Sequence, residues 1–203
     1  MNAESLEVTP GEVGELLLRG PHVSKGYWNN PEATAAVLDS QGWFHTGDLA
    51  RRDEDGFFYI AGRSKDMFIS GGVNVYPAEI EGELLLHPEV RDAAVIGVPH
   101  PVWGEIGVAF VVPHEWTATG VPDRENVEAP FQTPALATDL ATHLTQRIAR
   151  FKVPKEFLFV ESLPRTPYGK VAKAELRSRY EECHKQKKEP GAARLPNTPG
   201  GCA

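Results

Sequence analysis

The sequence predicts an α+β protein in which a small β-rich region comes first and a compact domain of strands and helices follows. Two observations lead to this prediction. Between residues 11 and 62, short apolar runs are bounded by glycines and an Asp-Gly turn, a pattern typical of strands joined by tight turns. Between residues 67 and 180, buried-type strands alternate with amphipathic helical segments. We expect this second region to form a mainly antiparallel three-stranded sheet with helices on a face.

The β-rich region carries signals for strands and for one short helix. A strand is expected in "GEVGELLLRG", after an extended or disordered start at residues 1–10. Asn30 as N-cap and Pro31 at the first helical position predict a short helix. The turn Asp55-Gly56 between "HTGDLARR" and "FFYIAGR" predicts a β-hairpin.

The compact region is expected to begin with the strand "MFIS", which runs into Gly71 and Gly72. Pro77 near a helix start and the stop signal His87-Pro88 then predict a helix. The spacing of its apolar residues predicts one buried face, made of Ile80, Leu84 and Leu85.

The rest of the compact region contains two adjacent strands, a helix, a strand and a last helix. "VRDAAVIGVP" and "IGVAFVVP" are separated by a short loop, so we expect them to be antiparallel neighbours. Residues 114–134 contain three prolines and little periodicity, which indicates a loop or insertion. A helix, the strand "EFLFVES" and the helix "KVAKAELRSRYEE" follow, and residues 181–203 are expected to be a disordered tail. The first of these helices has an apolar stripe of Leu136, Leu140, Leu144 and Ile148.

Charge is distributed unevenly along the 203 residues, whose net charge is −7. Residues 1–149 hold 9 Lys/Arg and 22 Asp/Glu (9 − 22 = −13), whereas residues 150–188 hold 11 Lys/Arg and 5 Asp/Glu (11 − 5 = +6). The overall acidity disfavours a nucleic-acid partner. The basic segment fits a small polyanion such as a nucleotide, or it is a solvated basic helix face.

The remaining composition suggests a cytoplasmic protein. No segment approaches the roughly 20 apolar residues of a membrane helix, so we expect no membrane span. The first residues lack the basic and apolar parts of a signal peptide. Cys183 and Cys202 form neither a disulfide framework nor a metal-ligand spacing, and no metal site is expected.

Four stretches, in this order, resemble the AMP-forming acyl-CoA synthetases, also called the adenylate-forming or luciferase-like superfamily. They are "GELLLRGPHVSKGYWNNPEAT", "GWFHTGD", "GRSKDMFISGGVNVYPAEIE" and "LPRTPYGKVAKAEL". The resemblance runs from about Gly11 to Tyr180. The stretch "SGGVNVYPAEIE" is most similar to fatty-acyl or aromatic-acid CoA ligases. It implies a reaction in which ATP activates a carboxylic acid to an acyl-adenylate, pyrophosphate leaves, and CoA takes the acyl group.

The resemblance implies roles for several polar residues. Asp48 matches an aspartate that accepts hydrogen bonds from the ribose hydroxyls, although "TGD" alone favours an Asx-type cap in a glycine turn. Arg63 matches an arginine near the ribose and phosphate, or it is an exposed residue at a hairpin end. Lys65 and Asp66 fall in the hinge, residues 63–66, between the last β-rich subdomain of the family's large domain (11–62) and its small C-terminal domain (67–180).

Further matches concern CoA and the reaction itself. Gly71 and Gly72 correspond to glycines that approach the pantetheine arm, although such a pair also simply turns a chain. Trp103 and Phe151 resemble positions lining the CoA adenine site, or they are core aromatics. Lys170 matches the catalytic lysine, whose ammonium would lie between the attacking carboxylate and the α-phosphate.

The sequence also departs from the family. The Ser/Thr/Gly-rich phosphate loop and the Tyr-Gly-x-Thr-Glu motif are not found, so ATP and Mg²⁺ would be bound through a separate N-terminal ligase domain. Two hypotheses follow. The chain is the C-terminal part of an acid–CoA ligase that acts on a small carboxylic acid with ATP and CoA. Alternatively, it is a non-catalytic module that either binds CoA or a nucleotide or is vestigial.

Overall fold

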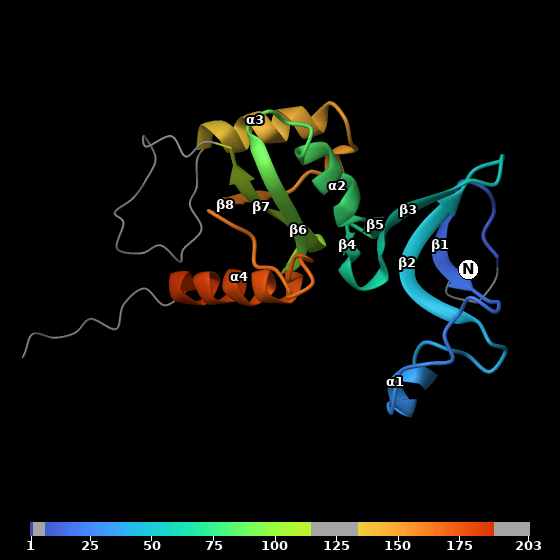
Figure 1. Ribbon diagram of the computed structural model, residues 1–203. Coiled ribbons are helices and arrows are strands. Elements are labelled where there is room, and N and C mark those ends of the chain that lie inside the picture. Colours follow the sequence, from blue (N-terminus) through green and yellow to red (C-terminus); the bar gives the residue numbers. More distant parts are fainter. Residues whose placement is uncertain (2–6, 115–133, 189–203) are drawn as a thin grey trace, which may run out of the picture.

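The computed structural model describes residue 1, residues 7–114 and residues 134–188, and it contains two separate β-sheets (Figure 1). The first sheet is antiparallel with strand order β1-β2-β3. Its strands are β1 (Val13–Leu18), β2 (Phe44–Arg52) and β3 (Phe58–Arg63), and helix α1 (Pro31–Ala35) lies in the β1–β2 connection. This confirms the predicted β-rich composition of the first region.

Local hydrogen bonds explain the two turn signals of the first sheet. The Asn30 side chain caps α1 by accepting a hydrogen bond from the amide of Ala33 at 3.0 Å. In the β2–β3 hairpin, Asp53 accepts hydrogen bonds from the amide of Phe57 and the hydroxyl of Tyr59, each at 2.9 Å. The Phe57 amide is the main cause of a lowered pKa at Asp53. Both the predicted helix and the predicted hairpin are therefore confirmed.

The second sheet has five strands, with order β5-β4-β7-β6 and β8 paired to β7. They are β4 (Phe68–Ser70), β5 (Val73–Val75), β6 (Val90–His100), β7 (Gly104–Pro113) and β8 (Glu156–Phe159). The β7–β8 pairing is parallel and the other pairings are antiparallel. The predicted number of three strands is wrong, because the predicted strand "MFIS" (β4) pairs with β5 and this hairpin adds to the sheet edge. β5 was not predicted, because a three-residue strand shows almost no periodicity.

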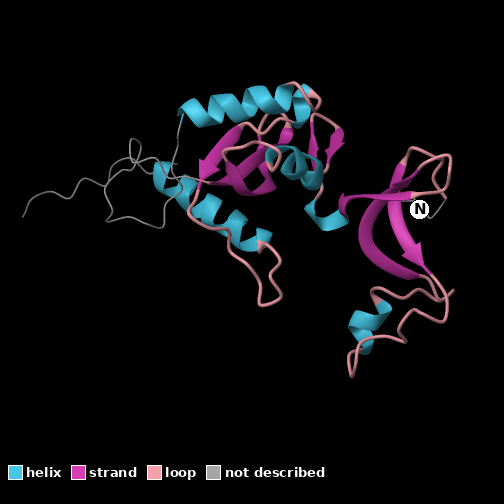
Figure 2. Ribbon diagram, turned by 45° about the horizontal axis from the view of Figure 1, so that its top comes forward, coloured by secondary structure: helices cyan, strands magenta, loops and turns pink. Residues whose placement is uncertain are grey.

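Helices cover both faces of the second sheet. Figures 1 and 2 show α2 (Pro77–Leu84) and α3 (Pro134–Thr145) on one face and α4 (Lys173–Lys188) on the other. Two short 3-10 turns, η1 (Ser64–Asp66) and η3 (Arg150–Lys152), complete the described helical elements. Coverage on both faces explains why β6 and β7 are continuous apolar runs rather than alternating ones.

The core is correspondingly divided into two clusters by the sheet. Alternate residues of β6 point to opposite faces, as the strand pleat requires. The cluster under α2 and α3 includes Phe68, Ile80, Leu84, Val95, Leu140, Leu144 and Phe159. The cluster under α4 includes Ala94, Ile96, Phe110, Leu158, Leu163 and Leu176. Leu85, predicted on the buried face of α2, is instead 49% exposed. It is the C-cap residue directly after Leu84, and one residue further along a helix points about 100° away around the axis.

Helix α4 extends further than expected. Its span to Lys188 passes the predicted domain end at Tyr180, so the prediction of a disordered tail is wrong for its first part. The Tyr180 hydroxyl donates a hydrogen bond to Glu156 on β8 at 3.0 Å, and its ring stacks on His184 at 3.9 Å. Burial raises the pKa of Tyr180, and the charge of Glu156 adds to this effect. These contacts hold the additional turns against the sheet.

The other predicted irregular segments fall mainly outside the described residues. Most of the predicted loop at 114–134 and residues 189–203 of the predicted tail lie there. At the predicted extended start, Met1 exchanges two hydrogen bonds with the backbone of Glu15 on β1.

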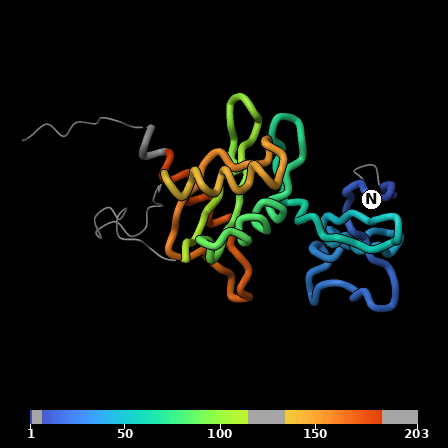
Figure 3. The backbone as a smooth tube through the Cα atoms, turned by 90° about the horizontal axis from the view of Figure 1, so that it is seen from above, coloured from blue at the N-terminus to red at the C-terminus, as the bar shows by residue number. Residues whose placement is uncertain are grey.

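The first sheet, in contrast to the second, has almost no core. Among the described residues up to Arg63, Ala50 is the one buried apolar side chain. Large side chains on β3 and its turn remain exposed: Phe57, Phe58, Tyr59 and Ile60. The tube in Figure 3 shows the two sheets as separate bodies joined by one passage of the chain.

Candidate functional site

A cleft of about 710 Å³ lies where the first sheet faces the second domain. The end of β3 and η1 contribute Arg63, Lys65 and Asp66, and β2 contributes Asp48. The opposite wall consists of residues from α2, from the loop that carries Lys170, and from the start of α4. The structure thus brings together the residues predicted to face the nucleotide, the predicted hinge residues and the predicted catalytic lysine.

Asp48 and Arg63 form the wall on the first sheet. They are cross-strand partners in the β2–β3 register, and the Nε atom of Arg63 lies 2.6 Å from Oδ1 of Asp48. Both side chains are partly exposed, so the pair remains accessible to a ligand. A carboxylate has acceptor sites for several donors, and a guanidinium has five N–H groups, so each can bind a ligand while they contact each other.

Lys170 lies at the end of a tight loop that is closed by backbone hydrogen bonds. The amide of Thr166 donates to the carbonyl of Lys170 at 2.8 Å, and the amide of Gly169 donates to the carbonyl of Thr166 at 2.9 Å. Gly169 has a φ of 79°, a conformation that favours glycine. The Lys170 side chain is exposed and makes no ion pair within the part of the chain that the structure describes. Its ammonium is therefore available to a ligand.

The cleft also contains charged residues that were not predicted as site residues. Glu81 on α2 forms an ion pair with Lys173 at 2.7 Å and accepts a hydrogen bond from the amide of Val95 at 2.7 Å. Arg177, one helical turn after Lys173, lines the same cleft. The spacing of four residues between these two cations on a predicted helix was a usable signal for a shared basic face.

The charges that line the cleft favour an anionic ligand. Five cationic side chains face three carboxylates, an excess of +2 (5 − 3). The Asp48–Arg63 and Glu81–Lys173 pairs neutralise part of this charge. The charges outside these two pairs belong to three cations and one carboxylate: Lys65, Lys170, Arg177 and Asp66. A cleft lined by an excess of positive charge attracts small anions.

The four residues predicted on the CoA side do not line this cleft. Gly71 and Gly72 form the β4–β5 turn with φ values of 59° and 82°. Gly71 donates a hydrogen bond to the Trp103 carbonyl at 2.9 Å, and a Cβ on Gly71 would lie 3.1 Å from the indole ring. Trp103 is 47% exposed and Phe151 is 38% exposed, so neither is a core aromatic. Phe151 lies separately, in η3.

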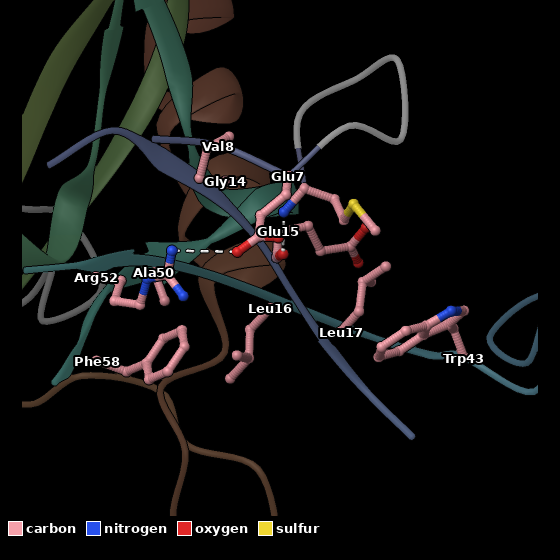
Figure 4. Close-up of a pocket in the computed structure, with 11 residues that line it drawn as sticks. Glu7, Val8, Gly14, Glu15, Leu16, Leu17, Trp43, Ala50, Arg52 and Phe58 are labelled. Atoms are coloured by element: carbon pink, nitrogen blue, oxygen red, sulfur yellow. Dashed lines mark hydrogen bonds and ion pairs between the residues drawn. The ribbon is translucent and has the colours of Figure 1, made fainter. Parts of the chain in front are cut away.

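A second, smaller hollow of about 330 Å³ lies against the first sheet (Figure 4). Leu17, Trp43 and Phe58 give it apolar walls, and Arg52 pairs with Glu7 at its rim at 3.1 Å. It contains none of the predicted site residues. Because its walls are mainly apolar, it is suited to cover by other protein rather than to a charged ligand.

The described residues include neither a candidate metal centre nor a candidate membrane-spanning helix. Across residues 7–114 and 134–188, no three His, Cys, Asp or Glu side chains are grouped so that they could hold a metal ion. No described helix combines the length and apolar character needed to span a membrane.

The chain is similar in sequence to known acid–CoA ligases. Residues 79–170 match the family described as the AMP-binding enzyme C-terminal domain. The feruloyl-CoA synthase of an Amycolatopsis species is 48% identical over 173 residues, which are 85% of this chain and 32% of that protein. A long-chain-fatty-acid–CoA ligase of Mycobacterium tuberculosis is 42% identical over 82% of this chain and 30% of its own length.

A solved structure gives the same fold. The o-succinylbenzoate CoA synthetase of Bacillus subtilis, in complex with its acyl-adenylate intermediate, has a TM-score of 0.71 and 35% identity. The match covers 84% of this chain and 31% of that one. The chain thus spans about a third of the length of the proteins it matches. Residues 79–170 therefore form an AMP-binding enzyme C-terminal domain, and the chain is related through this domain and the preceding sheet to the acyl-CoA ligases.

Proposed function

We propose that the chain is the C-terminal part of an acid–CoA ligase and that it supplies Lys170 to the adenylation step. The observation that carries this proposal is the single cleft shared by Asp48, Arg63 and Lys170, which are far apart in the sequence. The excess of cationic side chains in this cleft supports an anionic ligand, and a nucleotide has that chemistry.

In the proposed first step, a carboxylate oxygen of the acid attacks the α-phosphorus of ATP. A bond from this oxygen to phosphorus forms, the α–β phosphoanhydride bond breaks, and pyrophosphate leaves. The ammonium of Lys170 reduces the repulsion between the two anions and stabilises the added charge on the phosphate oxygens. Asp48 accepts hydrogen bonds from the ribose hydroxyls, and Arg63 binds near the ribose and phosphate.

In the proposed second step, the CoA sulfur forms a bond to the acyl carbon and the thiol loses its proton. The bond from the acyl carbon to the phosphate oxygen breaks, and AMP leaves. Gly71, Gly72, Trp103 and Phe151 serve the CoA side. The partial exposure of both aromatic rings supports this assignment, and so does the close approach of Gly71 to Trp103. Lys65 and Asp66 form the hinge that turns the domain between the two steps. Their place in η1, the short connection between the two sheets, supports this role.

The proposed activity needs a partner region. The relatives are about three times as long as the matched segment, and the phosphate loop and the acyl pocket belong to the remainder in this proposal. We propose an N-terminal ligase domain as the partner that binds ATP and Mg²⁺.

Reconstitution tests the proposal. The chain is mixed with a separately expressed N-terminal portion of the feruloyl-CoA synthase relative, and pyrophosphate release is measured with ATP and aromatic or fatty acids. We expect release from the mixture and none from either part alone. Lys170→Ala is expected to lower the rate by about 10²–10³-fold. Lys155→Ala, an exposed lysine outside the cleft, is the matched control. A mixture that binds but releases no pyrophosphate argues against the proposal.

The alternative is a non-catalytic module that binds CoA or a nucleotide. The basic cleft favours it as much as it favours an enzyme, because binding needs only the charges. Calorimetric titration of the isolated chain with AMP and with CoA, beside the reconstitution, separates the two. Binding without rescue of pyrophosphate release supports the module.

A further inference from the structure

Arg165 contacts the Lys170 loop and the second sheet at the same time. Its Nη1 atom donates a hydrogen bond to the carbonyl of Gly169 at 2.7 Å, and its Nη2 atom contacts the Asp92 carboxylate. Gly169 directly precedes Lys170, so the acceptor belongs to the peptide group that joins them. One guanidinium therefore links a strand to the peptide bond before the lysine.

Asp92 is a fixed anchor for this link. It lies on β6, where it pairs with Val112 of β7, and its other carboxylate oxygen accepts a hydrogen bond from the amide of Ala93 at 3.0 Å. The neighbouring residues Ala93 and Ala94 are buried in the two core clusters. The carboxylate is thus held near the start of β6, an edge strand of the second sheet whose next residues are buried.

The loop needs such a link because of its glycine. Glycine has the widest backbone freedom of all residues, and the peptide group after Gly169 sets the direction of the Lys170 side chain. A hydrogen bond to the Gly169 carbonyl fixes the plane of that peptide group. The backbone hydrogen bonds of Thr166 close the loop at its base but leave this carbonyl to Arg165.

We propose that Asp92 and Arg165 are positioning residues that clamp the loop and direct Lys170 into the cleft. The role of this clamp in catalysis rests on the function proposed above. Arginine suits the task because its rigid fork donates in two directions at once. The Arg165 and Asp92 side chains are 47% and 28% exposed, so their ion pair adds little to folding stability. Its effect in this proposal is on the orientation of the Lys170 loop.

The clamp itself is tested on the full chain without any activity assay. Amide hydrogen exchange of Thr166 and Gly169 is measured by NMR in the wild type, Arg165→Gln and Asp92→Asn. We expect exchange at these two amides to be about tenfold faster in both variants, with the amides of β6 and β7 unchanged. Arg179→Gln is the control, because it breaks a comparable exposed pair with Glu175 on α4 that does not touch the loop. Exchange at wild-type rates in Arg165→Gln overturns the clamp.

The positioning role is tested in the reconstituted mixture by single-turnover measurement of acyl-adenylate formation. Arg165→Gln is expected to lower the rate constant by about tenfold to a hundredfold while KM for ATP stays within about twofold. In a Lys170→Ala background, the same substitution is expected to have no further effect. An equal loss in both backgrounds overturns the role, because Arg165 would then act without Lys170.

The two arms separate the two proposals. If the wild-type mixture makes no acyl-adenylate, the proposed function fails, and Asp92 and Arg165 then have no role in catalysis. The exchange measurement then still decides whether they clamp the loop. If the wild type is active and only the double-variant test fails, the proposed function stands and the positioning role is rejected.

Discussion

The two sheets of this protein differ in how many of their apolar side chains are buried. The five-stranded sheet is covered by α2 and α3 on one face and by α4 on the other, and each face has its own apolar cluster. The three-stranded sheet has one buried apolar side chain, Ala50, among its described residues and leaves aromatic residues exposed. A packed core supplies most of the stability of a domain, so the second unit is expected to fold alone and the first is expected to need cover.

The largest expected effect comes from a cavity in the packed unit. Leu144→Ala removes a fully buried side chain of α3, and we expect a loss of about 2–5 kcal/mol in the free energy of unfolding. Urea unfolding followed by circular dichroism measures it. Leu86→Ala is the matched control, since Leu86 is 70% exposed. Similar losses for the two variants would remove the contrast between core and surface in this unit.

A clash in the same unit is the next largest effect. A Cβ added at Gly97 on β6 would lie 2.3 Å from the Cβ of Phe68, an atom too close to the backbone to move easily. We expect Gly97→Ala to cost about 1–3 kcal/mol or more in stability. Gly56→Ala, at a turn where a Cβ meets nothing within 4 Å, separates steric clash from backbone strain. If Gly97→Ala has wild-type stability, the packing around Phe68 is looser than described.

An intermediate effect is expected where the packed unit meets the cleft. Glu81→Ala removes the acceptor of the Val95 amide, which is buried, and the partner of Lys173. An unsatisfied buried donor costs about 1–3 kcal/mol, and thermal unfolding measures the loss. Glu81→Gln keeps an acceptor oxygen and is expected to lose less. An equal loss in both variants would assign the effect to the charge alone.

The smallest expected effect lies in the three-stranded sheet. Phe58→Ser changes a side chain that is 61% exposed, so the stability of the isolated chain should change by no more than about 0.5 kcal/mol. In reconstitution the same variant should bind the N-terminal portion more weakly, since Phe58 lines the apolar hollow. A large loss of stability in the isolated chain would mean that the first sheet has a core of its own.

Local signals in the sequence predicted most of the elements. Asn30 and Pro31 define α1, and Asp55-Gly56 lies in the β2–β3 turn, because caps and turns depend on a few adjacent residues. The family resemblance supplied the site residues, and the β2–β3 register pairs two of them, Asp48 and Arg63.

Other features depend on contacts that a single segment does not reveal. The β5 strand is too short for periodicity and is defined by its pairing with β4. The turns of α4 after Tyr180 are polar in sequence and are held by Glu156, which lies far back in the chain. The link between Asp92, Arg165 and Gly169 joins distant segments in the same way. Only the tertiary structure reveals such contacts.

The parallel pairing of β7 and β8 has a consequence for how this chain tolerates changes in length. A parallel pair requires a long crossover, and here it runs from Pro113 at the end of β7 through α3, which begins at Pro134. Figure 1 shows the end of β7 and the start of α3 at the end of the domain remote from β3 and from the start of α4. Lengthening a connection costs little entropy, so we expect residues added between β7 and α3 to leave the cleft unchanged. This crossover is a suitable place to insert a reporter domain, which would follow the protein without obstructing its cleft.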